Sequence, residues 1–439
     1  MTRNGPEADE TCSPLDYTYP SPELQECPFP YYQALRQQAP VHQIPGRDEY
    51  LVSRWEDITY IAEHPDLFSS ALVPGSVTAS SRTGGAEQTS FSYFADGHAA
   101  VGAAGDATFG YSPTSMAICD PPENKMKRAV GLKLIGRERL RDYEPFIRRY
   151  TEELIDSFID RREVEFVGEF ASWLPIKVIA DVLGLPQQDL TLLKRLGGRA
   201  AQGARFLTDE ELAEEDRASR ELVEYLRTHI LDRYDNPRDD GLGQLVSGQV
   251  ARDGRLNLQY LMSEAGVLLV AGNASTSHML SSAMMLLLQN PDQLEQVQVN
   301  RSLIRPLLEE ALRLESPVQW TSRTTTQDVE ITDVQVPAGS TLLILWASGN
   351  RDPRKWEDAD RFWPERPDIA KRQLAFGRGA HLCLGAPLAR LEGEIAFNML
   401  LDRMTNLCFT PGKNDFTHVT VPHFRAPKAV YMHFDRVEA

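Results

Sequence analysis

A glycine-rich run near the C-terminus places one cysteine where it could bind a metal. Residues 376–385 read Phe-Gly-Arg-Gly-Ala-His-Leu-Cys-Leu-Gly, and a strongly helical segment follows them. Backbone N–H groups and the start of that helix would favour negative charge on the sulfur of Cys383, which could then act as a thiolate ligand. Gly377, Gly379 and Gly385 permit positive φ and leave no Cβ to clash with a flat partner. The run therefore indicates a metal-binding loop that lies against a planar group.

Other chemistries fit this loop less well. Cysteine is often a small buried hydrophobic residue, and glycine-rich loops before helices are common. His381 and Cys383 could bind zinc, but zinc needs two more spaced ligands, which this neighbourhood lacks. A phosphate-binding loop normally ends in Lys-Ser/Thr, where this one has Cys-Leu-Gly. A thiolate ligand is the interpretation that uses the whole run.

The run resembles the haem-binding loop of the cytochrome P450 family. Every defining position of Phe-Gly-x-Gly-x-His-x-Cys-x-Gly is filled, by Phe376, Gly377, Gly379, His381, Cys383 and Gly385. The resemblance implies haem b ligated by Cys383, and a mainly α fold with small β-sheets, which is a triangular-prism α-rich domain with a minor β lobe. It also implies a monooxygenase that uses O2, because an axial thiolate favours O–O cleavage.

A second motif pairs opposite charges. Glu310 and Arg313 lie three residues apart on a predicted helix, where their side chains can pair. The resemblance makes them the family's Glu-x-x-Arg pair, which locks the core behind the thiolate loop, and it adds a second arginine from a downstream meander. We assign that role to Arg361, while Arg366 is the family's alternative and the sequence separates the two poorly.

The resemblance also identifies partners for the haem propionates. His381, Arg323 and Arg128 occupy the family's positions, and arginine matches a carboxylate bidentately. The family has a histidine after Asp-Pro-Pro-Glu, whereas this chain has Asn124, which can donate only a neutral hydrogen bond. One propionate contact is therefore in doubt, and a solvated charge is the alternative for Arg128.

A predicted helix over 258–289 carries a larger departure from the family. It resembles the family's central helix I, whose motif Ala-Gly-x-(Asp/Glu)-Thr-Thr aligns with Ala271, Gly272, Asn273, Ala274, Ser275 and Thr276. In the family the small Ala-Gly pair makes room for O2, and the acid and alcohol relay protons to it.

The missing acid changes the expected proton route. Ala274 cannot carry a proton, while Ser275 keeps a hydroxyl, so the relay to solvent must run elsewhere. His278 lies one turn further on and could titrate near neutral pH, although packing is the commoner role of such a histidine.

The substrate pocket implied by the resemblance is mostly apolar. Its expected walls are Val267, Leu268, Val318, Trp320 and Phe424. Trp320 would narrow the pocket if it pointed inward, and an outward packing role is equally consistent with the sequence. We expect hydroxylation or O-dealkylation of a lipophilic small molecule. The alternatives are a haem enzyme that uses peroxide or substrate-assisted proton delivery, for oxidative coupling or isomerisation, and a non-catalytic haem-binding protein.

The organisation of the chain is that of one unit, with residues 1–439 as a single domain. We expect a polar extension at 1–25 and a β-rich lobe around residues 50–53. A long segment at 69–115 between the family's helices B and C either roofs the pocket or is a mobile surface insertion. The remaining expected elements are helical runs at 139–183 and 209–234, an F–G connection at 200–208, and β-like alternations at 329–344 and 419–434.

The composition limits compartment and macromolecular partners. A net charge of −17 argues against nucleic acid or an anionic membrane as the main partner. No apolar run approaches the roughly 18 residues that span a bilayer, so we expect a cytoplasmic monomer without a membrane anchor. The five cysteines are irregularly spaced, which is typical of free thiols in a reducing compartment.

The electrons must come from another protein, because the sequence has no flavin or iron–sulfur motif. The resemblance implies a separate ferredoxin or flavodoxin with an NAD(P)H-dependent reductase. A basic cluster on the thiolate side could dock an acidic ferredoxin, with a solvated helix face as the alternative; it consists of Lys125, Lys127, Arg128 and Lys133.

Overall fold

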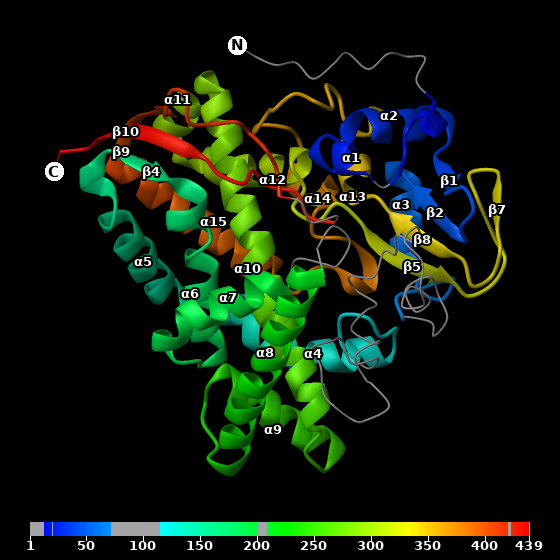
Figure 1. Cartoon of the computed structure of the whole chain (residues 1–439), viewed down its shortest axis with the longest axis horizontal. Coiled ribbons are helices and arrows are strands. Elements are labelled where there is room, and N and C mark those ends of the chain that lie inside the picture. Colours follow the sequence, from blue (N-terminus) through cyan, green and yellow to red (C-terminus); the bar gives the residue numbers. More distant parts are fainter. Residues whose placement is uncertain (1–12, 20, 72–114, 201–208, 420–422, 439) are drawn as a thin grey trace.

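The computed structural model describes residues 13–19, 21–71, 115–200, 209–419 and 423–438, in which helices predominate and three small sheets form (Figure 1). The α-helices are α1 Pro22–Glu26, α2 Phe29–Gln38, α3 Trp55–Glu63, α4 Glu123–Ile135, α5 Leu140–Asp156, α6 Leu174–Leu183, α7 Leu190–Ala200, α8 Asp209–Asp235, α9 Gly241–Asp253, α10 Leu258–Gln289, α11 Pro291–Val299, α12 Ile304–Leu314, α13 Trp346–Gly349, α14 Ile369–Arg372 and α15 Ala386–Arg403. The strands are β1 Val41–Gln43, β2 Glu49–Val52, β3 Phe68–Ser69, β4 Glu163–Glu165, β5 Thr321–Thr325, β6 Val329–Ile331, β7 Val334–Val336, β8 Thr341–Ile344, β9 Met404–Phe409 and β10 Tyr431–Arg436.

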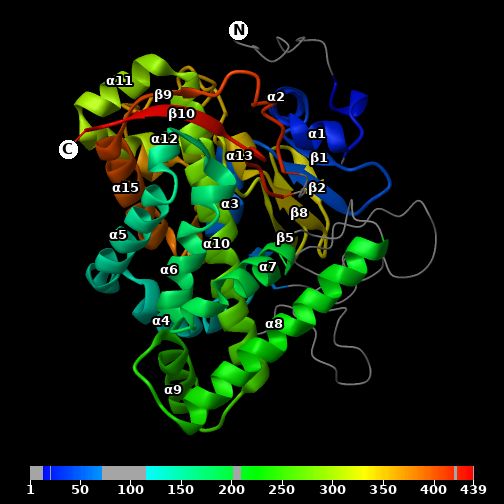
Figure 2. The same ribbon diagram turned by 60° about the vertical axis from the view of Figure 1, so that its left-hand side comes forward.

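The long helix α10 runs through the middle of the molecule, with α5, α6, α12 and α15 around it (Figures 1 and 2). Side chains of these helices form the largest hydrophobic core, which explains why most of α10 is apolar on more than one face. The Asn257 side chain accepts a hydrogen bond from the Tyr260 N–H at 3.1 Å and caps its start. Asn290-Pro291 ends it, because the residue before a proline disfavours the helical conformation. The predicted bounds of this helix are confirmed.

A five-stranded sheet joins the N-terminal strands to residues 321–344. Its order is β1-β2-β8-β5-β3, in which β2 runs parallel to β8 and the other neighbours are antiparallel. The predicted alternation over 329–344 is confirmed as β6, β7 and β8, and its turn places Gly339 at a φ of +82°. The expected β-rich lobe is therefore present, and it extends the sheet that carries Arg323.

Two sequence-based expectations for the regular elements were wrong in part. The helical run at 139–183 is interrupted by β4 and by a π-helical turn at Val167–Ala171. The interruption follows from a long-range pairing, Val164 opposite Met432, which no local periodicity reveals. Only Tyr431–Arg436 of the region 419–434 forms a regular strand among its described residues.

Some expectations concern residues that the structure does not describe. These residues are 1–12, 20, 72–114, 201–208, 420–422 and 439, which include most of the 69–115 segment and of the F–G connection. Whether 1–439 is one cooperative domain stays a prediction. Among the described residues, none of the helices combines the length and the apolar character needed to cross a membrane.

Candidate functional site

The loop that carries Cys383 leads directly into α15. The Cys383 N–H donates to the Phe376 carbonyl at 2.8 Å, which closes the loop. Burial raises the pKa of the Cys383 thiol, while the N–H groups of Gly385 and Ala386 and the charge of Arg128 lower it. Metal coordination deprotonates a thiol outright, so these donors would then stabilise the bound sulfur. The N–H groups expected around the sulfur are thus present, but burial outweighs them, so the pKa of the free thiol is raised rather than lowered.

Positive φ is needed at two of the three glycines of the loop. Gly377 and Gly379 have φ values of +68° and +67°. A Cβ on Gly379 would lie 2.0 Å from the Ala62 carbonyl oxygen, so a side chain there would collide with the end of α3. The expectation of positive φ was wrong for Gly385, whose φ is −82°, because this residue already adopts the helical conformation before α15.

A cavity of about 360 Å³ separates the loop from α10. Cys383 lies deep in the chain, yet its side chain remains accessible because it borders this cavity. Four of the expected wall residues also border the cavity, namely Val267, Leu268, Val318 and Phe424. Ala271, Gly272, Ser275 and Thr276 border it from α10. The sulfur and the central helix therefore border the same cavity.

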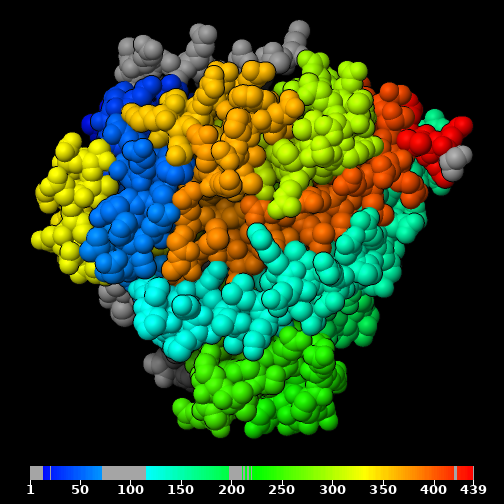
Figure 3. All heavy atoms as spheres, turned by 180° about the vertical axis from the view of Figure 1, so that it is seen from behind, coloured from blue at the N-terminus to red at the C-terminus, as the bar shows by residue number. Residues whose placement is uncertain are grey.

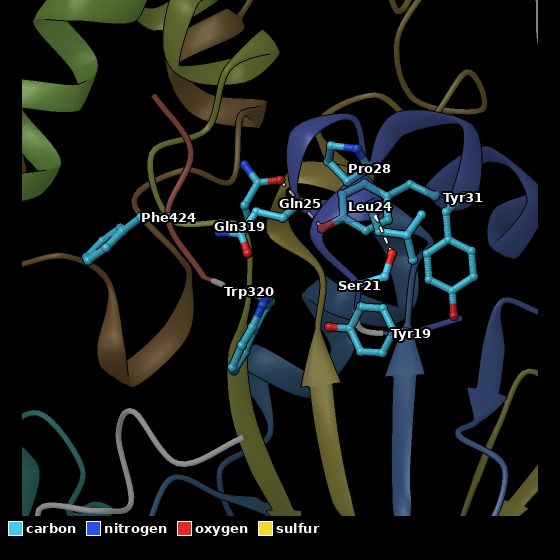
Figure 4. A pocket seen from close by; sticks show the side chains of 10 residues that line it. Tyr19, Ser21, Leu24, Gln25, Pro28, Tyr31, Gln319, Trp320 and Phe424 are labelled. Atoms are coloured by element: carbon cyan, nitrogen blue, oxygen red, sulfur yellow. Dashed lines mark hydrogen bonds between the residues drawn. The ribbon is translucent and has the colours of Figure 1, made fainter. Parts of the chain in front are cut away.

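Trp320 lies elsewhere. It borders a smaller pocket of about 30 Å³ next to α1 and α2, which also reaches Phe424 (Figure 4). Its ring packs edge-on against His423, with 5.9 Å between the ring centroids. Of the two roles that the sequence left open for Trp320, the structure favours packing outside the main cavity.

Three nitrogen-bearing side chains lie close together at the cavity. Arg323, Arg128 and His381 all border it. Arg323 is 8% exposed, and its guanidinium donates to the neighbouring Ser322 carbonyl at 2.7 Å. Burial, together with the charges of Arg323 and Arg128, lowers the pKa of His381 to about 3. The His381 Nε2 has no hydrogen-bond partner among the described residues. Buried cations and donors of this kind require an anionic partner.

Asn124 takes a supporting position. It is buried, and its amide donates to the Met116 carbonyl at 2.9 Å and lies 3.4 Å from His381 Nδ1. Arg128 donates to the Leu382 carbonyl, which ties α4 to the thiolate loop. Among the described residues Asn124 does not border the cavity, so its contact is with His381.

The α10 motif keeps its hydroxyl and lacks its acid, as the sequence predicts. The Ser275 hydroxyl donates a hydrogen bond to the Ala271 carbonyl at 2.8 Å. Its oxygen can therefore accept a hydrogen bond from a donor in the cavity. His278 packs against the Phe424 ring, with 5.3 Å between the centroids, and burial lowers its pKa to about 4. Its Nδ1 contacts no donor or acceptor of the described chain. These contacts favour the packing role of His278 over the relay role.

A buried charge network lies behind the loop. Glu310 accepts from Arg313 at 2.7 and 2.8 Å and from the Trp363 N–H at 3.0 Å. The assignment of Arg361 to this network was wrong, because its side chain is 62% exposed and pairs with Asp358. Arg366 instead reaches Glu310 at 3.3 Å. Arg361 contributes only its backbone carbonyl, which accepts from Arg313 and Arg366 at 3.1 Å each.

Two buried glutamates of the site were missed in the sequence. Glu264 on α10 accepts a hydrogen bond from the Met116 N–H at 2.9 Å, and burial raises its pKa to about 7. Glu392 on α15 borders the cavity, and burial raises its pKa well above the usual value. An acidic residue inside an otherwise apolar helix face was the signal for both.

The basic cluster expected on α4 is smaller than predicted. Lys127 is 5% exposed and pairs with Glu123, so it was wrongly placed on the surface. Lys125 and Lys133 are exposed, and they flank two exposed hydrophobic side chains, Met126 and Leu132. Figure 3 shows α4 in cyan beside the orange part of the chain that includes the thiolate loop.

Comparisons with known proteins identify this arrangement. A sequence model described as "Cytochrome P450" matches residues 169–413. The cyclomarin C epoxidase CymV of Salinispora arenicola is 31% identical over 90% of this chain and 91% of its own length. The 6-deoxyerythronolide B hydroxylase of Saccharopolyspora erythraea is 34% identical over 68% of this chain and 72% of its own. The structure of CYP109E1 from Bacillus megaterium with testosterone superposes with a TM-score of 0.79 at 26% identity, covering 94% of this chain and 99% of that one.

The chain therefore belongs to the cytochrome P450 family. It has the helix-rich fold of that family and is a haem monooxygenase that carries haem b. The residues at the cavity fit this group: Cys383 could supply the sulfur ligand, and the partnerless His381 nitrogen, the buried Arg323 and the half-buried Arg128 suit two propionates. Zinc finds no such support, since no group of three or more His, Cys, Asp or Glu side chains among the described residues could hold a metal ion.

We predict that substitution of Arg366, which pairs with Glu310, lowers the free energy of unfolding far more than substitution of Arg361. Arg366→Ala leaves Glu310 with an incomplete set of buried partners, so the free energy of unfolding should fall by about 3 kcal/mol or more. Arg361→Ala removes an exposed pair and should change it by no more than about 0.5 kcal/mol. Urea unfolding of both variants measures the difference, and equal effects would contradict the assignment of Arg366.

We predict a pH-dependent contribution from Glu264. Its folded pKa of about 7 exceeds the unfolded value of 4.5, so the folded state loses stability as the pH rises between these values. The whole loss amounts to about 3 kcal/mol. Glu264→Gln removes it, so urea unfolding should show the variant to be more stable than the wild type above pH 7 and equal to it at pH 4.5. A difference that does not vary with pH would contradict this prediction.

Proposed function

We propose that this monooxygenase hydroxylates or O-dealkylates a lipophilic small molecule. Two electrons come from a separate ferredoxin or flavodoxin, which an NAD(P)H-dependent reductase reduces. The observation that carries the proposal is the apolar wall facing Cys383, formed by Val267, Leu268, Val318 and Phe424. Such walls bind apolar ligands by excluding water and leave orientation to a few polar groups. Two relatives are named as an epoxidase of cyclomarin C and a hydroxylase of 6-deoxyerythronolide B, and the second of these names is consistent with hydroxylation.

The chain's residues divide the work of the reaction. The bound haem supplies the activation of O2 and the attack on the C–H bond. Cys383 would hold the haem iron, while Arg323, Arg128 and His381 would bind the propionates. Ala271 and Gly272 would leave room for the haem and its substrate in the cavity, because they carry almost no side chain. The Ser275 hydroxyl oxygen would accept a hydrogen bond from a water in the cavity.

A second candidate follows from Ala274. Because this position has no acid, the enzyme could use peroxide or take protons from a substrate hydroxyl, in oxidative coupling or isomerisation. Product formed per NADH consumed, with and without added peroxide, separates the candidates. The first proposal also includes a cytoplasmic location and a monomeric state for this protein.

We predict that Cys383 determines the spectrum of the reduced carbon monoxide complex. Cys383→Ala should abolish the far-red Soret band of cysteinate ligation, whereas Cys408→Ala, at an exposed thiol on β9, should leave it unchanged. Absorption spectra of the two purified variants measure this. A wild-type protein without the band would overturn the proposed function. A small-molecule library screened for loss of the axial water by spin-state shift then identifies the substrate.

We propose that the electron donor binds the α4 surface, defined here as Lys125, Met126, Leu132, Lys133 and the exposed Leu382. Arg128 joins α4 to the Leu382 carbonyl, so this surface lies beside the thiolate loop. The two lysines stand out on a chain with a net charge of −17, and the apolar side chains between them suit a short-lived protein contact. The occupant that fits is a small acidic ferredoxin.

We predict that Lys125→Glu with Lys133→Glu slows ferredoxin-supported reduction several-fold at low salt. Added salt should diminish the difference, because it screens exposed charges. Stopped-flow reduction measures the rates, and Arg227→Glu with Arg238→Glu, at two exposed arginines on α8 and just after it, is the control of equal charge change. An unchanged rate at low salt would remove the α4 surface as the docking site.

A further inference from the structure

Three residues that border the cavity lie in a turn that buried side chains hold in place. Met116, Ala117 and Ile118 border the cavity and belong to neither a helix nor a strand. The Met116 N–H donates to Glu264 on α10 at 2.9 Å, and the Met116 carbonyl accepts from the Asn124 amide on α4, also at 2.9 Å. Residues 115–118, the wall segment, are therefore fixed by two buried side chains from two different helices.

Glu264 contacts the wall segment from within α10. Its side chain is 0% exposed, and no described residue donates a hydrogen bond to its Oε2. Val267 and Leu268, three and four residues further along α10, share its helix face and border the cavity. A buried carboxylate oxygen without a donor is costly, because water would otherwise bind it. The wall segment is the neighbour of Glu264 that lies outside any helix or strand, so its displacement is the route by which water reaches the carboxylate.

Two cations face Glu264 from other helices. Lys127 on α4 and Arg252 on α9 attract its carboxylate. Each of them also pairs with an exposed or half-exposed carboxylate of its own, Glu123 for Lys127 and Asp253 for Arg252. Burial raises the pKa of Glu264 to about 7 in spite of the two cations. Neither cation therefore replaces the water that the charged carboxylate loses.

The remaining titratable groups beside Glu264 stay neutral. They are Tyr260 on α10 and Cys119, which follows the wall segment, and burial raises their pKa values to about 12 and 11. The ordinary pKa of a glutamate in water is 4.5, so the closed wall segment holds the proton of Glu264 more tightly than an open one would. Loss of that proton therefore favours the open arrangement.

We propose that Glu264 controls the opening of the substrate cavity: its protonated form keeps the wall segment closed, and loss of the proton to water allows the wall segment to open. This inference rests on the proposed function, which assigns the cavity to a lipophilic substrate. Opening becomes more frequent as the pH rises from 4.5 to about 7 and changes little above that. Glu264 is a positioning residue, because it binds the wall segment and not the substrate.

Hydrogen–deuterium exchange of the haem-loaded protein measures this opening. Each exchange rate is divided by that of the unfolded chain at the same pH, which gives the protection of the Met116 amide. We expect this protection to fall about tenfold between pH 5.5 and pH 7.5 in the wild type. In Glu264→Gln, whose amide accepts the same hydrogen bond and never ionises, the protection should stay constant. A constant protection in the wild type, or an equal fall in Glu264→Gln, would overturn the proposal.

Two further variants separate this role from general effects. Glu394 on α15 is another glutamate whose pKa burial raises, but it pairs with Arg305 and does not border the cavity. Glu394→Gln should keep the wild-type dependence on pH, and its loss there would contradict the assignment to Glu264. Asn124→Ala removes the other bond to Met116, so it should lower the protection several-fold at every pH. Wild-type protection in this variant would remove Asn124 from the proposal.

Carbon monoxide gives a second measurement that requires neither turnover nor the natural substrate. After photolysis of the reduced carbon monoxide complex, the bimolecular rebinding rate measures how readily a small molecule enters the cavity from solvent. Between pH 5.5 and pH 7.5 the rate should rise several-fold in the wild type and in Glu394→Gln, and it should not change in Glu264→Gln. A wild-type complex without the cysteinate band counts against the proposed function. A normal band with rebinding that does not depend on pH counts against the role of Glu264 alone.

Discussion

The site depends on one constraint: a sulfur atom must be presented inside the protein at a fixed place below α10. The loop fixes the sulfur because the Cys383 N–H donates to the Phe376 carbonyl and closes the loop. Two further N–H groups point at the sulfur. Gly379 lets the loop pass within contact distance of the Ala62 carbonyl. The Glu310, Arg313 and Arg366 network then holds the chain behind the loop, where a flexible surface pair could not position it.

The cavity contains two kinds of buried polar group that a protein core normally excludes. Arg323, Arg128 and His381 supply positive charge and hydrogen-bond donors, and Asp120 is the one carboxylate among the causes of the Arg323 pKa shift, so a bound dianion such as the haem propionates fits this group of side chains. Glu392 also borders the cavity, and burial raises the pKa of its carboxyl well above the usual value. The apolar walls between them strengthen both effects, because a low dielectric screens charge poorly.

The sequence predicts the parts of this site that lie close together along the chain. The thiolate loop, the Glu-x-x-Arg pair and the bounds of α10 follow from local spacing and capping. What it does not predict depends on side-chain direction or on distant partners. Arg361 and Arg366 lie five residues apart in one irregular meander, so nothing in the sequence tells which one turns inward. Lys127 looks like a surface lysine until α4 is placed, and then its position faces Tyr260. The break between α5 and α6 reflects pairing with a strand near the C-terminus.

The parallel pairing of β2 with β8 also bears on how the protein is made. Residues 49–52 find their neighbour only at residues 341–344, and β3 likewise waits for β5. Contacts between such distant segments form slowly because a long loop must close first. During synthesis, β1 and β2 can pair with each other, whereas β2 and β3 remain without β8 and β5 until most of the chain has emerged, which leaves their open edges exposed to other chains.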